Sequence, residues 1–199
     1  IEIVHINDPA GDAKTLAHLI NFDSVQGKWA HEAVSEKTAD GEVMIINGKA
    51  ITCSQNTATK DTDWSKCDVV IEASGKIKTK ALLQGYLDQG VKRVVVTAPV
   101  KEDGILNVVM GVNDNLYDKA IHPIVTAASC TTNCIAPVVK VIHEKIGIKH
   151  GSITTIHNIT NTQTIIDAPH SDLRRARSCG TSLIPTTTGS ATAITHIFP

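Results

Sequence analysis

The sequence has few aromatic residues, almost no net charge and no long apolar run. Aromatic side chains make up 3% of the 199 residues, so stacking on exposed nucleobases is not expected. The formal net charge of −1 provides no strong field that attracts nucleic acid or a membrane surface. No apolar run approaches the ~20 residues of a membrane-spanning helix. These absences argue against nucleic-acid and membrane partners.

Cysteine is present in an odd number, five, and no secretion signal opens the chain. Both facts argue against a disulfide framework and predict a reducing, cytoplasmic compartment. Cys130 and Cys134 have the spacing of two metal ligands on one helix. No second pair of cysteines or histidines completes such a site, so we predict no metal.

A glycine-rich phosphate loop of the form G-x-G-x-x-G is also missing. The chain begins at Ile1 in a segment that already has the pattern of a strand, and it ends soon after a Gly/Thr-rich turn. We therefore expect a piece of a longer protein, truncated at both ends, whose first βα unit held that loop.

Short apolar runs alternate with helical patterns through the first 128 residues. Strands are expected at 1–6, 42–46, 50–53, 69–71, 93–97, 108–110 and 124–125, and helices at 13–20 and 78–88. The run at 69–71 is typical of a strand buried on both faces. Asn47-Gly48 predicts a hairpin turn. The alternation predicts an α/β fold with a Rossmann-type parallel sheet that lacks its first βα unit.

The pattern changes near residue 129. Beyond it we expect a helix at 131–145, an alternating strand at 152–159 and a polar loop at 160–188. We therefore predict two domains, a nucleotide-binding domain at 1–128 and the start of an α+β catalytic domain at 129–199.

Polar and small residues follow three of the expected strands, where ligands of parallel sheets bind. Asp8 is placed to accept hydrogen bonds from ribose hydroxyls, or it only caps the turn before Pro9. Ser74-Gly75 and Thr97 allow a flat cofactor to approach the backbone, or they are ordinary turn residues. From the residues alone both alternatives stay open.

The segment around Cys130 is the most informative of the chain. Ser129 can cap a helix that begins after it, so that Cys130 lies in the first turn, where the helix dipole favours a thiolate. A thiolate is a nucleophile, and His157, before the polar loop, is a candidate base. The alternatives are a packed cysteine and a surface histidine.

Hydroxyl and guanidinium groups flank this thiol and are frequent in the polar loop that follows His157. Thr160 and Thr162 face the same way in an extended chain, and arginine grips phosphate through two N–H groups. The donors are Ser129, Thr131, Thr160, Thr162, Arg174, Arg175, Arg177, Thr186, Thr187, Thr188 and the backbone of Gly189. They indicate an anion site, or a solvated loop.

The run Ser129-Cys130-Thr131-Thr132-Asn133-Cys134 resembles the active-site signature of glyceraldehyde-3-phosphate dehydrogenases. Asp172-Leu173-Arg174-Arg175-Ala176-Arg177 and Ile184-Pro185-Thr186-Thr187-Thr188-Gly189 are also similar to landmarks of this family, and the resemblance covers essentially the whole chain.

The resemblance implies a role for each matching residue. Cys130 is the nucleophile and His157 the acid/base. Ser129, Thr131, Arg175, Thr188 and Gly189 bind inorganic phosphate, and Thr160 and Thr162 bind the phosphate of the substrate. Asp8, Ser74, Gly75 and Thr97 contact NAD.

The implied reaction is NAD-dependent oxidation of glyceraldehyde 3-phosphate to 1,3-bisphosphoglycerate, in a cytoplasmic homotetramer. The segments 156–169 and 171–181 resemble a subfamily associated with arsenate resistance, which implies arsenate as an alternative oxyanion. Erythrose 4-phosphate as the substrate, or a non-catalytic thiol or nucleic-acid binding module on the same scaffold, remain alternatives.

Overall fold

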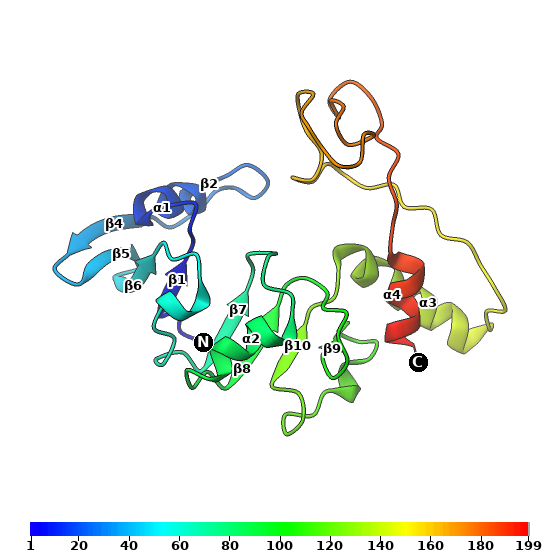
Figure 1. Cartoon of the computed structure of the whole chain (residues 1–199), viewed down its shortest axis with the longest axis horizontal. Helices are drawn as coiled ribbons and strands as arrows, with labels where there is room; N and C mark the ends of the chain where they lie inside the picture. The colour runs from blue at the N-terminus through cyan, green and yellow to red at the C-terminus, as the bar shows by residue number, and fades with distance from the viewer. Residues whose placement is uncertain (199) are drawn as a thin grey trace. The chain divides into compact units, whose positions relative to one another are not determined.

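The computed structural model describes residues 1–198 and divides into two compact units (Figure 1). The N-terminal unit comprises Ile1–Asn107 and Tyr117–Ala127, and the C-terminal unit comprises Val108–Leu116 and the chain from Ala128 onward. Residues 108–116 thus join the second unit although they precede the last strand of the first. The domain boundary at 128/129 stays a prediction.

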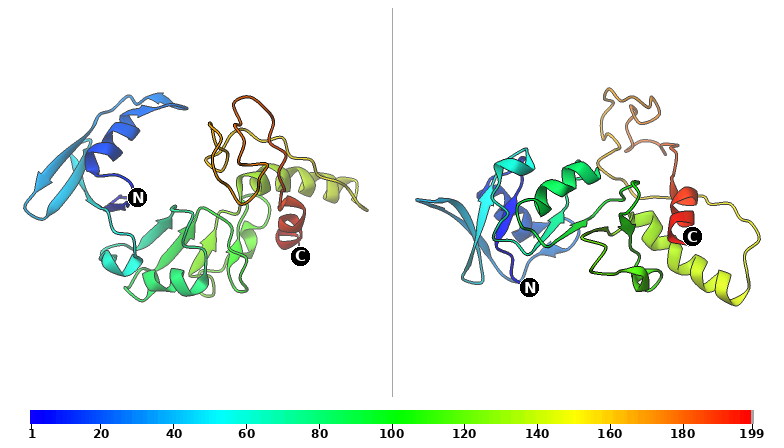
Figure 2. Two further views of the ribbon diagram at one scale, coloured as in Figure 1. Left: turned by 45° about the horizontal axis from the view of Figure 1, so that its top comes forward. Right: turned by 60° about the horizontal axis from the view of Figure 1, so that its bottom comes forward.

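The N-terminal unit contains an all-parallel sheet of four strands in the order β7-β8-β10-β9. Their bounds are β7 Val69–Glu72, β8 Arg93–Val96, β9 Leu106–Asn107 and β10 Ile124–Thr126. The parallel pairing confirms the predicted fold class. Helix α2 (Lys80–Leu87) lies on one face of this sheet (Figure 2), where Leu83 and Tyr86 are buried against Val70 and Val94.

The prediction that the 69–71 run is buried on both faces is wrong for the described residues. Val70 and Glu72 are buried, whereas Val69 and Ile71 are 52% and 68% exposed. Successive side chains of a strand point to opposite faces, and α2 covers only one of them. The other face keeps its apolar side chains exposed.

A second, mixed sheet has the order β1-β6-β5-β4. Its strands are β1 His5–Asn7, β4 Ala33–Thr38, β5 Gly41–Ile46 and β6 Lys49–Ser54, and α1 (Ala13–Asn21) packs on it through Ala17 against Met44 and Ile51. Asn47 and Gly48 both have positive φ, 50° and 76°, which confirms the predicted hairpin turn. Only His5 and Ile6 of the expected strand 1–6 are in β1, because the pairing with β6 begins at His5.

Short elements complete the N-terminal unit. They are the two-stranded ribbon of β2 (Phe22–Asp23) and β3 (Gly27–Lys28), and the single 3₁₀ turn at Thr59–Asp61.

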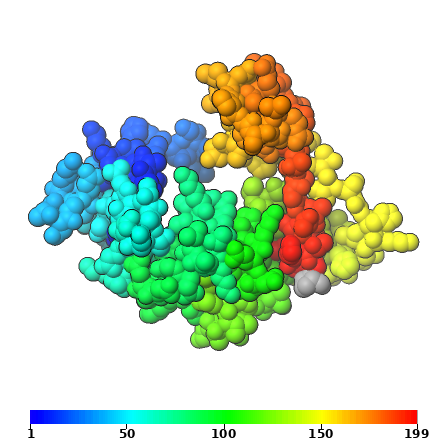
Figure 3. Space-filling view, viewed as in Figure 1, coloured from blue at the N-terminus to red at the C-terminus, as the bar shows by residue number. Residues whose placement is uncertain are grey.

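The C-terminal unit contains helices α3 (Cys130–Lys145) and α4 (Ser190–Ile197), and a 3₁₀ turn at Asp114–Leu116. Its small core joins Val109 and Val112 to Ala136 of α3 and Ile197 of α4. The segment between the helices has no regular structure but folds back on itself (Figure 1), and its orange atoms form one rounded group in Figure 3. Hydrogen bonds from Ala168 N to Ala176 O and from Cys179 N to Thr164 O, 3.0 and 2.9 Å, hold it together.

Two expected strands are absent from the described structure. The alternating segment 152–159 is irregular, and β9 ends at Asn107 instead of covering 108–110. A strand exists only where a neighbour accepts and donates its ladder hydrogen bonds, and neither segment has such a neighbour among residues 1–198. In the same range, no helix is long and apolar enough to cross a bilayer.

Candidate active site

The site begins at the first turn of α3. Ser129 has extended backbone angles (φ −112°, ψ 160°), and its Oγ accepts a 3.1 Å hydrogen bond from Thr132 N. This is the geometry of an N-cap, as predicted. Helix α3 begins at the next residue, Cys130, one position earlier than expected. The side chain of Cys130 is exposed. A thiolate at this position lies close to the unpaired N–H groups of the helix start.

Cys130 Sγ lies 3.4 Å from His157 Nε2, although 26 residues separate them in the sequence. The opposite ring nitrogen, Nδ1, lies 2.8 Å from the carbonyl oxygen of Asn158. A carbonyl oxygen only accepts, so Nδ1 carries a proton in this contact. Nε2 therefore either takes the thiol proton or, as part of an imidazolium, donates to the thiolate.

The electrostatics of this pair favour the ionised form. The hydrogen bond from His157 lowers the pKa of Cys130, against a smaller opposing effect of partial burial. The same contact, together with the Asn158 carbonyl, raises the pKa of His157. Both shifts favour thiolate and imidazolium over thiol and neutral imidazole.

A polar pocket of about 380 Å³ lies beside the pair. It is lined by Thr131, Ile153, Thr154, Thr155, His157, Thr160, Thr162, Gln163, Arg175, Thr186, Thr187 and Thr188. The lining is rich in hydroxyls and contains one guanidinium and no carboxylate. Such a set of donors is suited to an anion.

Most of the predicted anion-site residues meet in this pocket. Thr131, Thr160, Thr162, Arg175 and Thr188 all line it, although they come from three separate segments. Ser129 does not line the pocket but caps α3, and Gly189 is the N-cap residue of α4. Thr188 Oγ1 lies 2.8 Å from Ser190 Oγ in the first turn of that helix.

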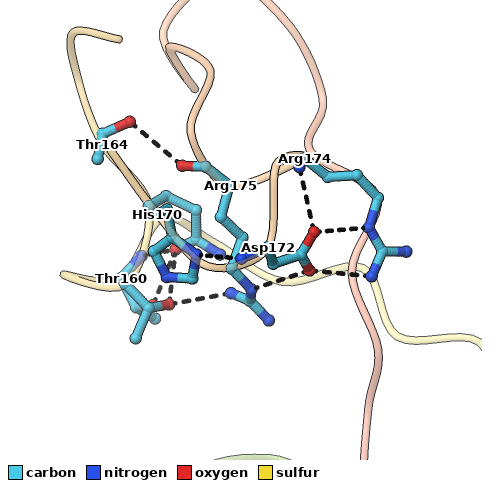
Figure 4. A network of polar contacts seen from close by, with 8 residues as sticks. Thr160, Thr164, His170, Asp172, Arg174 and Arg175 are labelled. Atoms are coloured by element: carbon cyan, nitrogen blue, oxygen red, sulfur yellow. Dashed lines mark hydrogen bonds and ion pairs between the residues drawn. The ribbon is translucent and has the colours of Figure 1, made fainter. Parts of the chain in front are cut away.

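The three predicted arginines have different surroundings, although Arg174 and Arg175 share the carboxylate of Asp172. Arg174 makes two hydrogen bonds to the carboxylate of Asp172, 3.0 and 2.9 Å (Figure 4). Arg177 forms an ion pair with Asp167 at 2.6 Å. Arg175 alone lines the pocket, where its NH1 donates to Thr162 Oγ1 at 3.2 Å. The spacing in sequence did not show which arginine the fold turns inward.

In the N-terminal unit, Asp8 directly follows β1. Its Oδ1 accepts from Ala10 N at 2.9 Å, so this carboxylate does stabilise the turn, and its Oδ2 has no hydrogen-bond partner among residues 1–198. The turn-capping alternative and the ribose-binding alternative are thus compatible, because the two oxygens can serve different partners.

Ser74 and Thr97 follow the neighbouring strands β7 and β8, and one residue connects them. Glu72 accepts from Ser74 N and Ser74 Oγ through Oε1, while its backbone oxygen accepts from Thr97 N at 3.0 Å. Gly75 has φ +69°, which permits the turn after Ser74. The predicted cofactor residues Ser74, Gly75 and Thr97 are therefore brought together at one edge of the parallel sheet.

Glu72 itself was missed by the analysis of the sequence. It is 5% exposed, and its Oε2 accepts a 2.6 Å hydrogen bond from Tyr86 of α2. Burial and this carboxylate raise the pKa of Tyr86. The available signal was a carboxylate in an apolar strand, which is rare unless it is paired.

The chain thus combines a parallel α/β sheet with a helix-borne thiol–imidazole pair beside an anion pocket. Comparison with known proteins supports both parts of this description. Residues 1–80 match a profile of "Glyceraldehyde 3-phosphate dehydrogenase, NAD binding domain", and residues 129–199 match one of "Glyceraldehyde 3-phosphate dehydrogenase, C-terminal domain".

Curated relatives match along the entire chain. It is 56% identical to glyceraldehyde-3-phosphate dehydrogenase 3 of Nostoc sp., 45% to glyceraldehyde-3-phosphate dehydrogenase 2 of Bacillus subtilis and 42% to the enzyme of Geobacillus stearothermophilus. Each alignment covers 100% of this chain but 57–58% of the relative. The chain belongs to the glyceraldehyde-3-phosphate dehydrogenase family, and it spans little more than half the length of these relatives.

Proposed function

We propose that the full-length protein oxidises glyceraldehyde 3-phosphate with NAD and phosphate to 1,3-bisphosphoglycerate. The observation that carries this proposal is the 3.4 Å contact between Cys130 Sγ and His157 Nε2 beside a pocket lined with hydroxyls and one guanidinium. A nucleophile paired with a base suits attack on an aldehyde. An anion pocket next to it suits a phosphorylated substrate and a phosphate co-substrate.

In the proposed mechanism Cys130 gives its proton to His157, and the thiolate adds to the aldehyde carbon. The imidazolium returns this proton to the new oxyanion, which forms a hemithioacetal. Bound NAD supplies the hydride acceptor. His157 removes the hydroxyl proton as the hydride leaves, so the product on Cys130 is a thioester. Inorganic phosphate then attacks the thioester, and the sulfur leaves as a thiolate.

The residues of the N-terminal unit fit NAD. Asp8 Oδ2 is an acceptor without a partner among residues 1–198, as a ribose hydroxyl requires. A carboxylate at that point also repels a 2′-phosphate, which favours NAD over NADP. Ser74, Gly75 and Thr97 present small side chains at the carboxyl edge of the parallel sheet, where a flat ring can approach the backbone.

We assign the anion-binding residues to two oxyanions. Thr160 and Thr162 hold the phosphate of the substrate. Inorganic phosphate is held by Ser129, Thr131, Arg175, Thr188 and the Gly189 backbone. Arsenate has the charge and shape of phosphate, so the same donors accept it, and we propose it as an alternative oxyanion.

The test is NADH formation by the full-length protein. We expect NADH from glyceraldehyde 3-phosphate only when phosphate or arsenate is present. Cys130→Ser should abolish turnover, by more than about 10³-fold because the nucleophile is lost, and should leave NAD binding by calorimetry unchanged. Turnover that survives in Cys130→Ser would refute the mechanism.

The same assay decides between the alternatives. A higher kcat/KM with erythrose 4-phosphate than with glyceraldehyde 3-phosphate would identify the other aldehyde as the substrate. No NADH from either aldehyde would favour a thiol or nucleic-acid binding module. A kcat/KM for arsenate at or above that for phosphate would support the arsenate assignment.

We place the reaction in the cytoplasm, because all five cysteines are free thiols, as a reducing compartment maintains. We also propose a homotetramer of the full-length protein. Its support is the number of apolar side chains that the irregular segment of the C-terminal unit exposes, among them Ile165, Ile166 and Leu183 at 77%, 79% and 93%. Exposed apolar patches commonly mark protein–protein interfaces.

A further inference from the structure

One end of the anion pocket contains a chain of hydrogen bonds whose direction is fixed. Gln163 Oε1 accepts from both Thr160 N and Thr160 Oγ1, at 2.9 and 2.8 Å. A backbone N–H only donates, so the carbonyl end of the Gln163 amide must face Thr160. The hydroxyl proton of Thr160 is then directed at the same oxygen.

At the opposite end of this chain stands Arg175. Its NH1 donates to Thr162 Oγ1 at 3.2 Å, and a guanidinium has no acceptor. The two threonine hydroxyl oxygens lie 2.9 Å apart. Since the Thr160 proton goes to Gln163, the Thr162 proton goes to Thr160, whose oxygen is nearer than Gln163 Oε1 at 3.5 Å. The order of donation is therefore Arg175, Thr162, Thr160, Gln163.

The backbone closes around the same residues. Gln163 N donates to Thr160 O at 3.0 Å, so residues 160–163 form a turn. The Gln163 side chain reaches back to the backbone N–H three residues earlier, as the glutamate or glutamine of a capping box does. When an anion draws the two hydroxyl protons toward itself, the bond from Thr160 N to Gln163 still holds this turn.

We propose that Gln163 is a positioning residue of the Thr160–Thr162 subsite, which it holds ready for a phosphate monoester. The inference rests on the proposed function for the ligand class only. An ordered subsite binds its ligand more tightly because less freedom is lost on binding. Gln163 thus acts through the threonines.

The experiment measures ligand binding and not turnover. In the full-length protein, iodoacetamide alkylates Cys130, and sn-glycerol 3-phosphate, an unreactive phosphate monoester, is titrated as a protecting ligand. The variants are Gln163→Leu, Thr160→Val with Thr162→Val, and the triple combination. Gln55→Leu, an exposed glutamine of the N-terminal unit, is the matched control. Alkylation without ligand reports whether the Cys130–His157 pair is intact.

We expect Gln163→Leu to raise the half-protecting concentration about tenfold, because a Thr160 that is no longer held in place loses about one hydrogen bond to the charged ligand. In the double-threonine background the same change should add less than about twofold, because the groups that Gln163 positions are gone. Gln55→Leu should change nothing.

Three results would overturn the inference. They are unchanged protection in Gln163→Leu, an equal effect in both backgrounds, and no protection of the unsubstituted protein by the phosphate monoester. None of them requires NADH formation, so a failure of the proposed reaction is recognised separately, in the dehydrogenase assay.

Discussion

At the scale of single residues, the site depends on how one imidazole changes the chemistry of one sulfur. The hydrogen bond from His157 is the largest cause of the lowered pKa of Cys130. The thiolate is the form that reacts with alkylating agents. The rate of alkylation as a function of pH therefore measures this contact directly.

We predict that the alkylation of Cys130 begins at lower pH than that of an ordinary cysteine. His157→Gln removes the imidazole, so the pKa of Cys130 should rise toward the ordinary value. The rate at pH 7 should then fall, because a smaller fraction of the sulfur is thiolate. The measurement is a pH profile of iodoacetamide labelling with Cys130→Ser as the blank, which accounts for exposed Cys134. Identical profiles for His157→Gln and the unsubstituted protein would contradict it.

At the scale of secondary-structure elements, Glu72 connects β7 to α2 and to the start of the next loop. Its carboxylate accepts from Ser74 on one oxygen and from Tyr86 on the other, inside the unit. A buried polar group costs free energy when a partner is removed, because the remaining donors are left unpaired. This carboxylate should therefore stabilise both the packing of α2 on β7 and the loop after β7 that carries the predicted NAD contacts Ser74 and Gly75.

We predict that Glu72→Gln lowers the free energy of unfolding by about 1–3 kcal/mol, because the amide nitrogen cannot accept the hydrogen bond that one carboxylate oxygen accepts. Urea unfolding of the full-length protein measures it, and NAD affinity should fall in the same variant. Glu36→Gln, the same change on an exposed strand residue, is the control and should have almost no effect. Equal urea midpoints for the two variants would show that the Glu72 carboxylate does not stabilise the fold.

The helices were the elements that local sequence predicted best. Ser129 caps α3 as predicted, whereas α2 begins at Lys80, after the Thr79 cap and two residues later than expected. Caps and stops depend on residues within one turn, so they can be predicted from neighbouring letters. The strand expected at 152–159 failed because strands depend on a partner that alternation does not identify.

At the scale of the whole molecule, much apolar surface of the C-terminal unit is exposed. Helix α3 exposes Val138 and Val141 at 56% and 61%, and Ile146 directly after it is 83% exposed. The irregular segment exposes Leu173 and Leu183 at 80% and 93%. Surfaces of this kind are normally covered by further protein. In the proposed homotetramer, further copies of the protein cover part of this surface.

We predict that the full-length protein is a tetramer by light scattering and that Leu183→Glu shifts it toward smaller species. A charge placed in an apolar contact is left without a partner, which is strongly unfavourable. Val25→Glu, at a residue of the N-terminal unit that is 89% exposed, is the control and should leave the mass unchanged. If the Leu183→Glu protein keeps the mass of a tetramer, Leu183 does not lie in the interface.

The letters alone were sufficient for the fold class, the Ser129 cap of α3 and the family. Each of these follows from short-range patterns: alternating apolar runs, a residue before a helix, and the run around Cys130. The fold was needed to bring His157 to the sulfur, to place Arg175 in the pocket lining while Arg174 and Arg177 stay outside it, and to bury Glu72. Some of these contacts join residues that are distant in sequence. Others distinguish one arginine from similar neighbours, and both depend on the path of the chain in space.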